Sequence, residues 1–150
     1  MKYRGRISGP LADRIDLHVN VSAVPVRQLG DSSPREMSVC VRSRVEAARA
    51  AQRDRYAKMP GDVWNGRVPG RWLDRHGEIV SGARELLAAA AERMGVSARS
   101  YHRILRVART IADLDGERVI ESRHVAEALR YRPAGMSANT PERTVDTLSA

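Results

Sequence analysis

The residues from Ser97 to Leu114, SARSYHRILRVARTIADL, constrain the fold more than any other stretch of this chain. An α-helix turns by about 100° per residue, so apolar side chains that recur every three or four positions form one stripe along it. Gly95 suits the left-handed end of a preceding helix, and Ser97 can cap the first backbone amides of the next. We therefore expect an amphipathic helix that buries Tyr101, Ile104, Leu105, Ala108, Ile111 and Ala112.

The opposite side of this helix carries three arginines, Arg99, Arg103 and Arg106. A basic stripe of this kind is most often a solvated face. It can also bind an anion, because a guanidinium keeps its charge and donates hydrogen bonds in a planar fork. The spacing alone leaves both interpretations open.

Composition favours a single, mainly helical domain. The chain has 150 residues, enough for one hydrophobic core, and only 4% of them are aromatic, with no Phe. A core built from Leu, Ile, Val and Ala favours helices over a β-sandwich. The formal net charge of +8 fits a polyanionic partner such as nucleic acid or a nucleotide phosphate, although an arginine bias can also reflect a GC-rich coding sequence.

The sequence is typical of a cytoplasmic protein. Cys40 is its one cysteine, so neither an internal disulfide nor a cysteine-based zinc site can form. No run of about 18 apolar residues is present, as a membrane span would require. The first residues, MKYRGRISG, lack the apolar stretch of a signal peptide. We expect no membrane contact.

The N-terminal region predicts a β-strand that has no partner. From Ile15 to Val21 apolar and polar residues alternate, which is the period of a half-buried strand, and no later stretch alternates in this way. A strand without a neighbour leaves its backbone groups unpaired, so its sheet must lie outside this chain. Either the strand pairs with another molecule or the sequence is a piece of a larger protein. Before the strand, Ser8-Gly9-Pro10 can open a short helical turn.

Three further helices are predicted beside the one that follows Ser97. They run from a capping-box pattern at Ser33-Pro34-Arg35-Glu36 to about Tyr56, from about Glu78 to Met94, and from about Ser122 to Arg130. In the first of them we expect an apolar stripe with Cys40 as a small packing residue beside it, formed by Met37, Val41, Val45 and Ala48.

The predicted architecture is a small four-helix bundle preceded by one orphan strand. Residues 1–30 form the part with the turn and strand, residues 31–132 the helical domain, and residues 133–150 a mobile tail rich in Pro, Ser, Thr and Ala. Between the first two helices, Pro-Gly dipeptides bracket a loop, and we expect Trp64 and Trp72 to pin it to the helices.

No self-contained catalytic motif is present. The sequence has no GxxxxGK[ST] phosphate loop, no GxSxG elbow and no HExxH zinc motif. The four histidines, at positions 18, 76, 102 and 124, are scattered through the strand, the loop and two helices, so we expect no metal site.

Two stretches resemble the magnesium-chelatase-like family of AAA+ ATPases. YRGRISGPLADRIDLHVNVSAV is similar to the segment that closes the α/β core of these ATPases, and SARSYHRILRVARTIADLDG followed by ESRHVAEALRYR is similar to their C-terminal helical lid. The sequences of these two stretches are most similar to the ComM/YifB branch, which comprises bacterial proteins implicated in DNA processing during natural transformation. The resemblance spans residues 3–132, and Ala12 departs from the Leu usual at that place.

The resemblance implies roles for two arginines. Arg14, in DRID, resembles the arginine finger that reaches the nucleotide of a neighbouring subunit, and Arg99 resembles the sensor 2 arginine that contacts the γ-phosphate held by its own subunit. Phosphoryl transfer spreads charge over the phosphate oxygens, and a guanidinium can bond two of them at once. For Arg103 and Arg106 we expect contact with DNA phosphates or with the next subunit.

The resemblance thus implies the C-terminal lid, plus one strand of the α/β core, of a ring-forming ATPase, which would meet an upstream AAA+ core and neighbouring subunits. ATP and Mg²⁺ would serve the full-length family protein, but we expect neither hydrolysis nor useful ATP affinity from this chain alone, because it lacks the phosphate loop and the acidic strand. The alternative is a stand-alone basic helical module that binds nucleic acid or a partner ATPase without catalysis. A third, weaker interpretation is a magnesium chelatase subunit of pigment synthesis.

Overall fold

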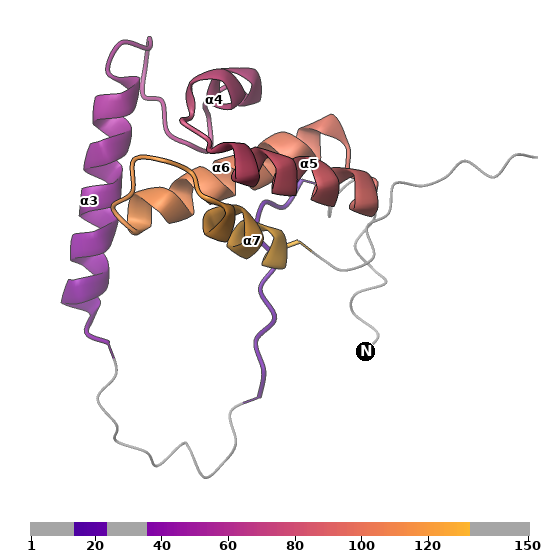
Figure 1. The fold of residues 1–150 in the computed structure, drawn as a ribbon. Helices are drawn as coiled ribbons and strands as arrows, with labels where there is room; N and C mark the ends of the chain where they lie inside the picture. Colours follow the sequence, from indigo (N-terminus) through magenta and orange to yellow (C-terminus); the bar gives the residue numbers. More distant parts are fainter. Residues whose placement is uncertain (1–13, 24–35, 133–150) are drawn as a thin grey trace, which may run out of the picture.

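The structure, a computed structural model, describes residues 14–23 and 36–132 (Figure 1). The described fold is mainly helical, as predicted, and its helices are α3 (Ser38–Tyr56), α4 (Gly70–His76), α5 (Ser81–Met94), α6 (Ala98–Leu114) and α7 (Ser122–Arg130). None of these helices combines the length and the apolar character that crossing a bilayer requires.

Helix α6 is the centre of the fold and contacts each of the other four helices. Its predicted apolar stripe lies in the core, where Leu105 and Ala108 have no exposed surface. The predicted boundary before it is also confirmed. Gly95 ends α5 with a left-handed φ of 57°. The Ser97 hydroxyl accepts a hydrogen bond from the Ser100 backbone N–H at 3.2 Å and so caps α6.

A short parallel bridge joins the start of α5 to the loop before α7. The Ile120 N–H donates to the Glu78 carbonyl at 2.9 Å, and the Val80 N–H donates to the Ile120 carbonyl at 3.1 Å. Glu78 has a φ of 49°, which lies outside the range of a right-handed helix. Helix α5 therefore begins at Ser81, and the prediction that it begins near Glu78 is wrong. The bounds predicted for α7 are confirmed.

Helix α3 begins later than its sequence pattern predicts. Met37 keeps an extended ψ of 144°, so the first helical residue is Ser38 and not a residue of the predicted capping box. Ser33, which would have provided the cap, lies outside the described residues. The C-terminal half of α3 is the part that packs on the bundle, because all of its buried residues lie there: Ala48, Gln52 and Tyr56.

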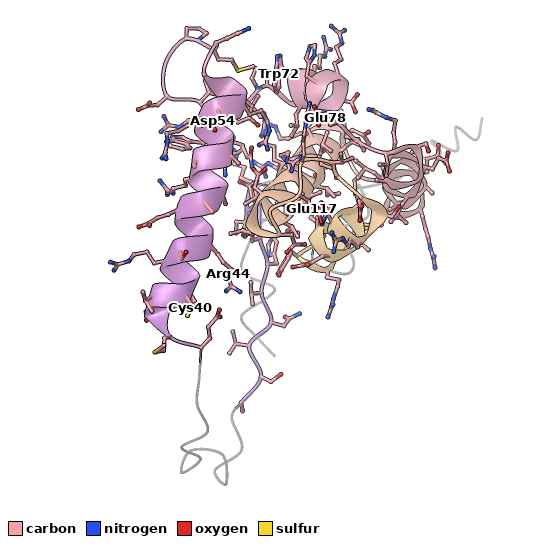
Figure 2. The ribbon with its side chains drawn as sticks, turned by 60° about the vertical axis from the view of Figure 1, so that its left-hand side comes forward. Cys40, Arg44, Asp54, Trp72, Glu78 and Glu117 are labelled. Carbon is pink, nitrogen blue, oxygen red and sulfur yellow. The ribbon has the colours of Figure 1, made fainter. Side chains whose placement is uncertain are left out.

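The N-terminal half of α3 reaches past the other helices, and Figure 2 shows Cys40 and Arg44 at this end. Cys40 is exposed, so the prediction that it is a small packing residue beside the stripe is wrong. The neighbouring positions of the predicted stripe are exposed too, with Val41 at 40% and Val45 at 39%. Amphipathic spacing identifies the apolar side of a helix, but it does not show whether the described chain covers that side.

The region between α3 and α5 contains a helix that the sequence analysis treated as loop. Trp72 lies within α4, and its ring packs edge-on against Tyr56 of α3 with the ring centroids 5.4 Å apart. Trp64 lies under the Arg49 guanidinium of α3, 5.3 Å from the ring centroid. Both tryptophans thus contact α3, as predicted, although one of them does so from a helix.

The described N-terminal segment, residues 14–23, is not a β-strand, so the predicted strand from Ile15 to Val21 is not formed here. Its apolar residues face outward, and Val19 and Val21 are 66% and 89% exposed. A strand requires a ladder partner, and the described chain provides none beside this segment. The His18 N–H instead donates to the Tyr131 carbonyl at 2.9 Å, at the end of α7. The predicted turn at residues 8–10 and the predicted tail lie outside the described residues.

Candidate phosphate site

A surface hollow of about 530 Å³ brings together the two arginines to which the sequence assigned nucleotide roles. Arg14 comes from the N-terminal segment and Arg99 from the first turn of α6. None of the described residues that line this hollow is acidic; they are Arg14, Arg99, His102, Arg103 and Arg106. Four guanidiniums on one concave surface favour an anion with several oxygens, such as a phosphate chain.

Hydrogen bonds fix the backbone of the first turn of α6, where Arg99 lies. Ser97 caps this turn, and the adjacent Ser100 is buried. The Ser100 hydroxyl in turn accepts a hydrogen bond from Nη2 of Arg132, at 2.7 Å. Arg99 itself is exposed beside these buried groups. The free backbone N–H groups of a helix start carry partial positive charge, which adds to that of the guanidinium.

An ion pair connects the N-terminal segment to the same face of α6. Nε of Arg103 lies 3.1 Å from Oδ1 of Asp16, and the Arg103 side chain is only 15% exposed. Arg103 follows Arg99 by one helical turn, and Asp16 follows Arg14 by two residues. The pair therefore joins the two stretches of chain that carry the candidate phosphate ligands.

Arg106 and His102 complete the lining of the hollow. Arg106 Nε donates to the Val68 carbonyl at 3.1 Å. The His102 ring packs edge-on against Tyr101, with centroids 5.4 Å apart, and its Nδ1 is buried with no hydrogen-bond partner among the described residues. The His102 side chain also lies against Gly70, where an added Cβ would come within 2.3 Å of its Cγ.

Sequence reasoning did not select His102. Its spacing was nevertheless informative, because His102 lies one turn after Arg99 and one turn before Arg106 on the same helix. No group of three or more metal-binding side chains occurs in the described parts of the chain.

A second polar cluster, also missed from the sequence, lies inside the fold between α3 and α6. The Asp113 side chain has no exposed surface and accepts hydrogen bonds from Arg55 at both carboxylate oxygens. It also accepts a bond from the Asn65 amide at 2.8 Å and one from Arg109 Nε at 3.1 Å. Each buried charge here is thus paired.

Tyr56 closes this cluster on the α3 side. Its hydroxyl donates to Oδ1 of Asn65 at 2.7 Å. Burial raises the pKa of Tyr56, and the positive charge of Arg55 opposes part of that rise. For Arg55, burial works against the charge, but the hydrogen bonds and negative charge of Asp113 raise its pKa overall. We interpret this cluster as structural, because it fixes α3 against the helix that bears Arg99.

The described fold is a helical domain whose central helix, α6, presents several arginines on one face. The chain belongs to the magnesium chelatase family. Residues 35–132 match the family described as magnesium chelatase, subunit ChlI C-terminal, and residues 1–29 match magnesium chelatase, subunit ChlI. The family resemblance noted in the sequence is confirmed.

The relatives that the chain resembles include ComM and YifB proteins. The chain is 39% identical over 133 residues to competence protein ComM of Haemophilus influenzae, covering 88% of this chain and 25% of that protein. It is 34% identical over 138 residues to the uncharacterised protein YifB of Escherichia coli, again covering 88% of this chain and 25% of the relative. An uncharacterised protein of Mycobacterium tuberculosis is 36% identical over 134 residues, covering 89% and 26%. The chain thus spans about a quarter of the length of these relatives.

Proposed function

We propose that this chain is the lid region of a ring-forming ATPase of the ComM/YifB type, in which Arg14 and Arg99 bind the phosphates of ATP. The observation that carries the proposal is the single hollow shared by these two arginines, with no acidic residue in its described lining. Hydrolysis builds negative charge on the phosphate oxygens, and a guanidinium stabilises that charge without giving up a proton.

The shared hollow also suggests whether Arg14 and Arg99 contact the same nucleotide or two different ones. The family resemblance assigns Arg14 to the nucleotide of a neighbouring subunit and Arg99 to that of its own subunit. Two arginines in one hollow of one chain are better suited to the same phosphate chain. We therefore assign both to one nucleotide, whose phosphate loop and Mg²⁺ ligands belong to an AAA+ core outside these residues. Mg²⁺ itself is a poor match for this basic lining, because it prefers carboxylate and water oxygens.

ATPase assays on an assembled protein test the proposal. This chain is mixed with a separately expressed upstream core, such as that of the Haemophilus influenzae relative, and ATP turnover is measured. We expect turnover only in the mixture, and a loss of about 10³- to 10⁵-fold for Arg14→Ala, the range typical of an arginine finger. Arg118→Gln is the matched control, because Arg118 pairs with Glu78 outside the hollow. Turnover that survives both Arg14→Ala and Arg99→Ala would rule the site out.

Mixing two variants decides which nucleotide the arginines serve. If Arg14 and Arg99 act on different nucleotides, a ring assembled from Arg14→Ala and Arg99→Ala lids contains some interfaces with both arginines intact. If they act on one nucleotide, every interface lacks an arginine. We expect no recovery of ATPase activity in the mixed ring, and recovery would restore the split assignment.

A role in DNA processing is the second part of the proposal. One relative is named a competence protein, and this chain has a formal net charge of +8. The competing function, a stand-alone basic module, is less consistent with the outward-facing apolar residues of segment 14–23, which suit burial against further protein. An in-frame or frame-shifted phosphate-loop motif in the genomic sequence upstream would favour the lid, and its absence would favour the module.

A further inference from the structure

The position of Arg14 depends on how the N-terminal segment is attached to the helices. Residues 14–23 form neither a helix nor a strand, so no regular backbone ladder fixes them. The contacts that connect this segment to the bundle include the Asp16–Arg103 ion pair at 3.1 Å and the bond from the His18 N–H to the Tyr131 carbonyl at 2.9 Å. The first of these lies within two residues of Arg14.

The charges around the hollow make this attachment necessary. Arg14 approaches three other guanidiniums, those of Arg99, Arg103 and Arg106. Like charges repel one another, so an untethered Arg14 would favour positions away from the hollow. The Asp16 carboxylate offsets the repulsion, because it gives the basic face of α6 a negative partner on the same short segment.

We propose that Asp16 and Arg103 are positioning residues, whose ion pair holds Arg14 over the hollow beside Arg99. The inference rests on the proposed function for its catalytic consequence, but the attachment itself can be measured without ATP. It gives Arg103 a role within the chain, in addition to the contact with DNA or a subunit that the sequence predicts.

The exposure of the pair indicates what its loss should change. Arg103 is only 15% exposed, but Asp16 is 59% exposed, so water screens the pair from the Asp16 side and its contribution to the stability of the fold is small. Position is much more demanding, because a shift of about 1 Å in a catalytic group can cost about 10²-fold in rate. Breaking the pair should therefore lower the ATPase kcat of the assembled protein by about 10²-fold while the urea midpoint of the chain stays the same.

The experiment is a double-mutant cycle with two readouts. Asp16→Asn, Arg103→Gln and the double variant are prepared, with Asp16→Glu as the conservative variant and Arg118→Gln as the control. The first readout is the ¹⁵N heteronuclear NOE of the Ile15 and Leu17 amides in this chain. The second is kcat in the mixture of chain and upstream core.

We expect both single variants to lower the NOE and kcat, the double variant to lower them no further, and Asp16→Glu to retain most of both. Additive losses, or single variants that match the wild type, would overturn the inference. A wild-type assembly without arginine-dependent turnover would contradict the proposed function instead. The NOE values of the cycle would still decide whether the pair positions the segment.

Discussion

Arg55 of α3 and Asp113 of α6 form a bidentate ion pair across the two helices, and the Asp113 side chain has no exposed surface. The same carboxylate accepts a hydrogen bond from Arg109, whose side chain is also fully buried. One acidic residue therefore compensates two guanidiniums, one of them far from water. Removing the Asp113 charge should lower the free energy of unfolding, because both guanidiniums would lose their negative partner.

We expect Asp113→Asn to destabilise the chain by about 3–5 kcal/mol, because it leaves Arg109 buried without a negative partner. Urea unfolding followed by circular dichroism measures the change. Glu78→Gln is the matched control, since Glu78 pairs with Arg118 at the surface and should alter the midpoint little. If the two substitutions lowered the free energy of unfolding equally, burial of the Asp113 cluster would not determine how much it contributes to stability.

The raised pKa of Tyr56 should make the stability of the chain depend on pH in the alkaline range. Its pKa is raised above the ordinary value of 10.0, mainly by burial, so the folded chain keeps the phenol proton at a pH where the unfolded chain loses it. This contribution to stability is complete below pH 10.0, and it is lost as pH rises through the folded pKa. The free energy of unfolding should therefore fall as the pH rises above 10.0.

Tyr56→Phe should flatten this alkaline slope. At neutral pH the variant should lose about 1 kcal/mol, because the Tyr56 hydroxyl no longer donates to Asn65. Tyr131→Phe is the comparison, since Tyr131 donates an exposed hydrogen bond to Glu127 and its pKa is raised chiefly by that bond. If Tyr56→Phe keeps the wild-type slope, then another group accounts for the alkaline loss.

Gly70 is a position where a single methyl group should disturb the hollow. A Cβ there would lie 2.3 Å from Cγ and 2.5 Å from Cβ of His102, atoms too close to the backbone to move aside cheaply. We expect Gly70→Ala to cost about 1–3 kcal/mol in urea unfolding. Gly66→Ala is the matched control, because nothing lies within 4 Å of its added Cβ. A stable Gly70→Ala variant with an unshifted His102 side-chain NMR signal would contradict the close packing.

Sequence patterns identified the elements that depend on local interactions. The stripe, the Ser97 cap and the Gly95 stop of α6 all follow from neighbouring residues, so they could be predicted. The start of α3 and the exposure of Val41 and Cys40 could not, because they depend on whether other parts of the chain cover that end of the helix. The strand predicted from the alternating residues of segment 14–23 is not formed for a related reason, because a strand requires a partner that the described chain lacks.

The site was predictable in its charges but not in its geometry. Family motifs selected Arg14 and Arg99, yet nothing in the spacing indicated that they would line one hollow. The Asp16–Arg103 and Arg55–Asp113 pairs join residues far apart in the sequence, so local patterns carry no signal for them. His102 was overlooked because a single histidine is more often structural than functional.

The arginines on the basic face of α6 should affect how DNA binding depends on salt. If Arg103 and Arg106 contact DNA phosphates, replacing both with Gln removes two of the contacts that release counterions. The slope of log K against log salt for duplex DNA should then become shallower by about 2, since each contact contributes about 0.9. Arg106 can take part because its Nε bond to the Val68 carbonyl uses one of five N–H donors of a guanidinium.

Fluorescence anisotropy at several salt concentrations measures the slope. The double variant Arg84→Gln with Arg118→Gln removes the same charge from arginines paired elsewhere, with Asp74 and Glu78. An unchanged slope for the Arg103 and Arg106 variant, or an equal change in the control, would exclude this face of α6 as the DNA contact.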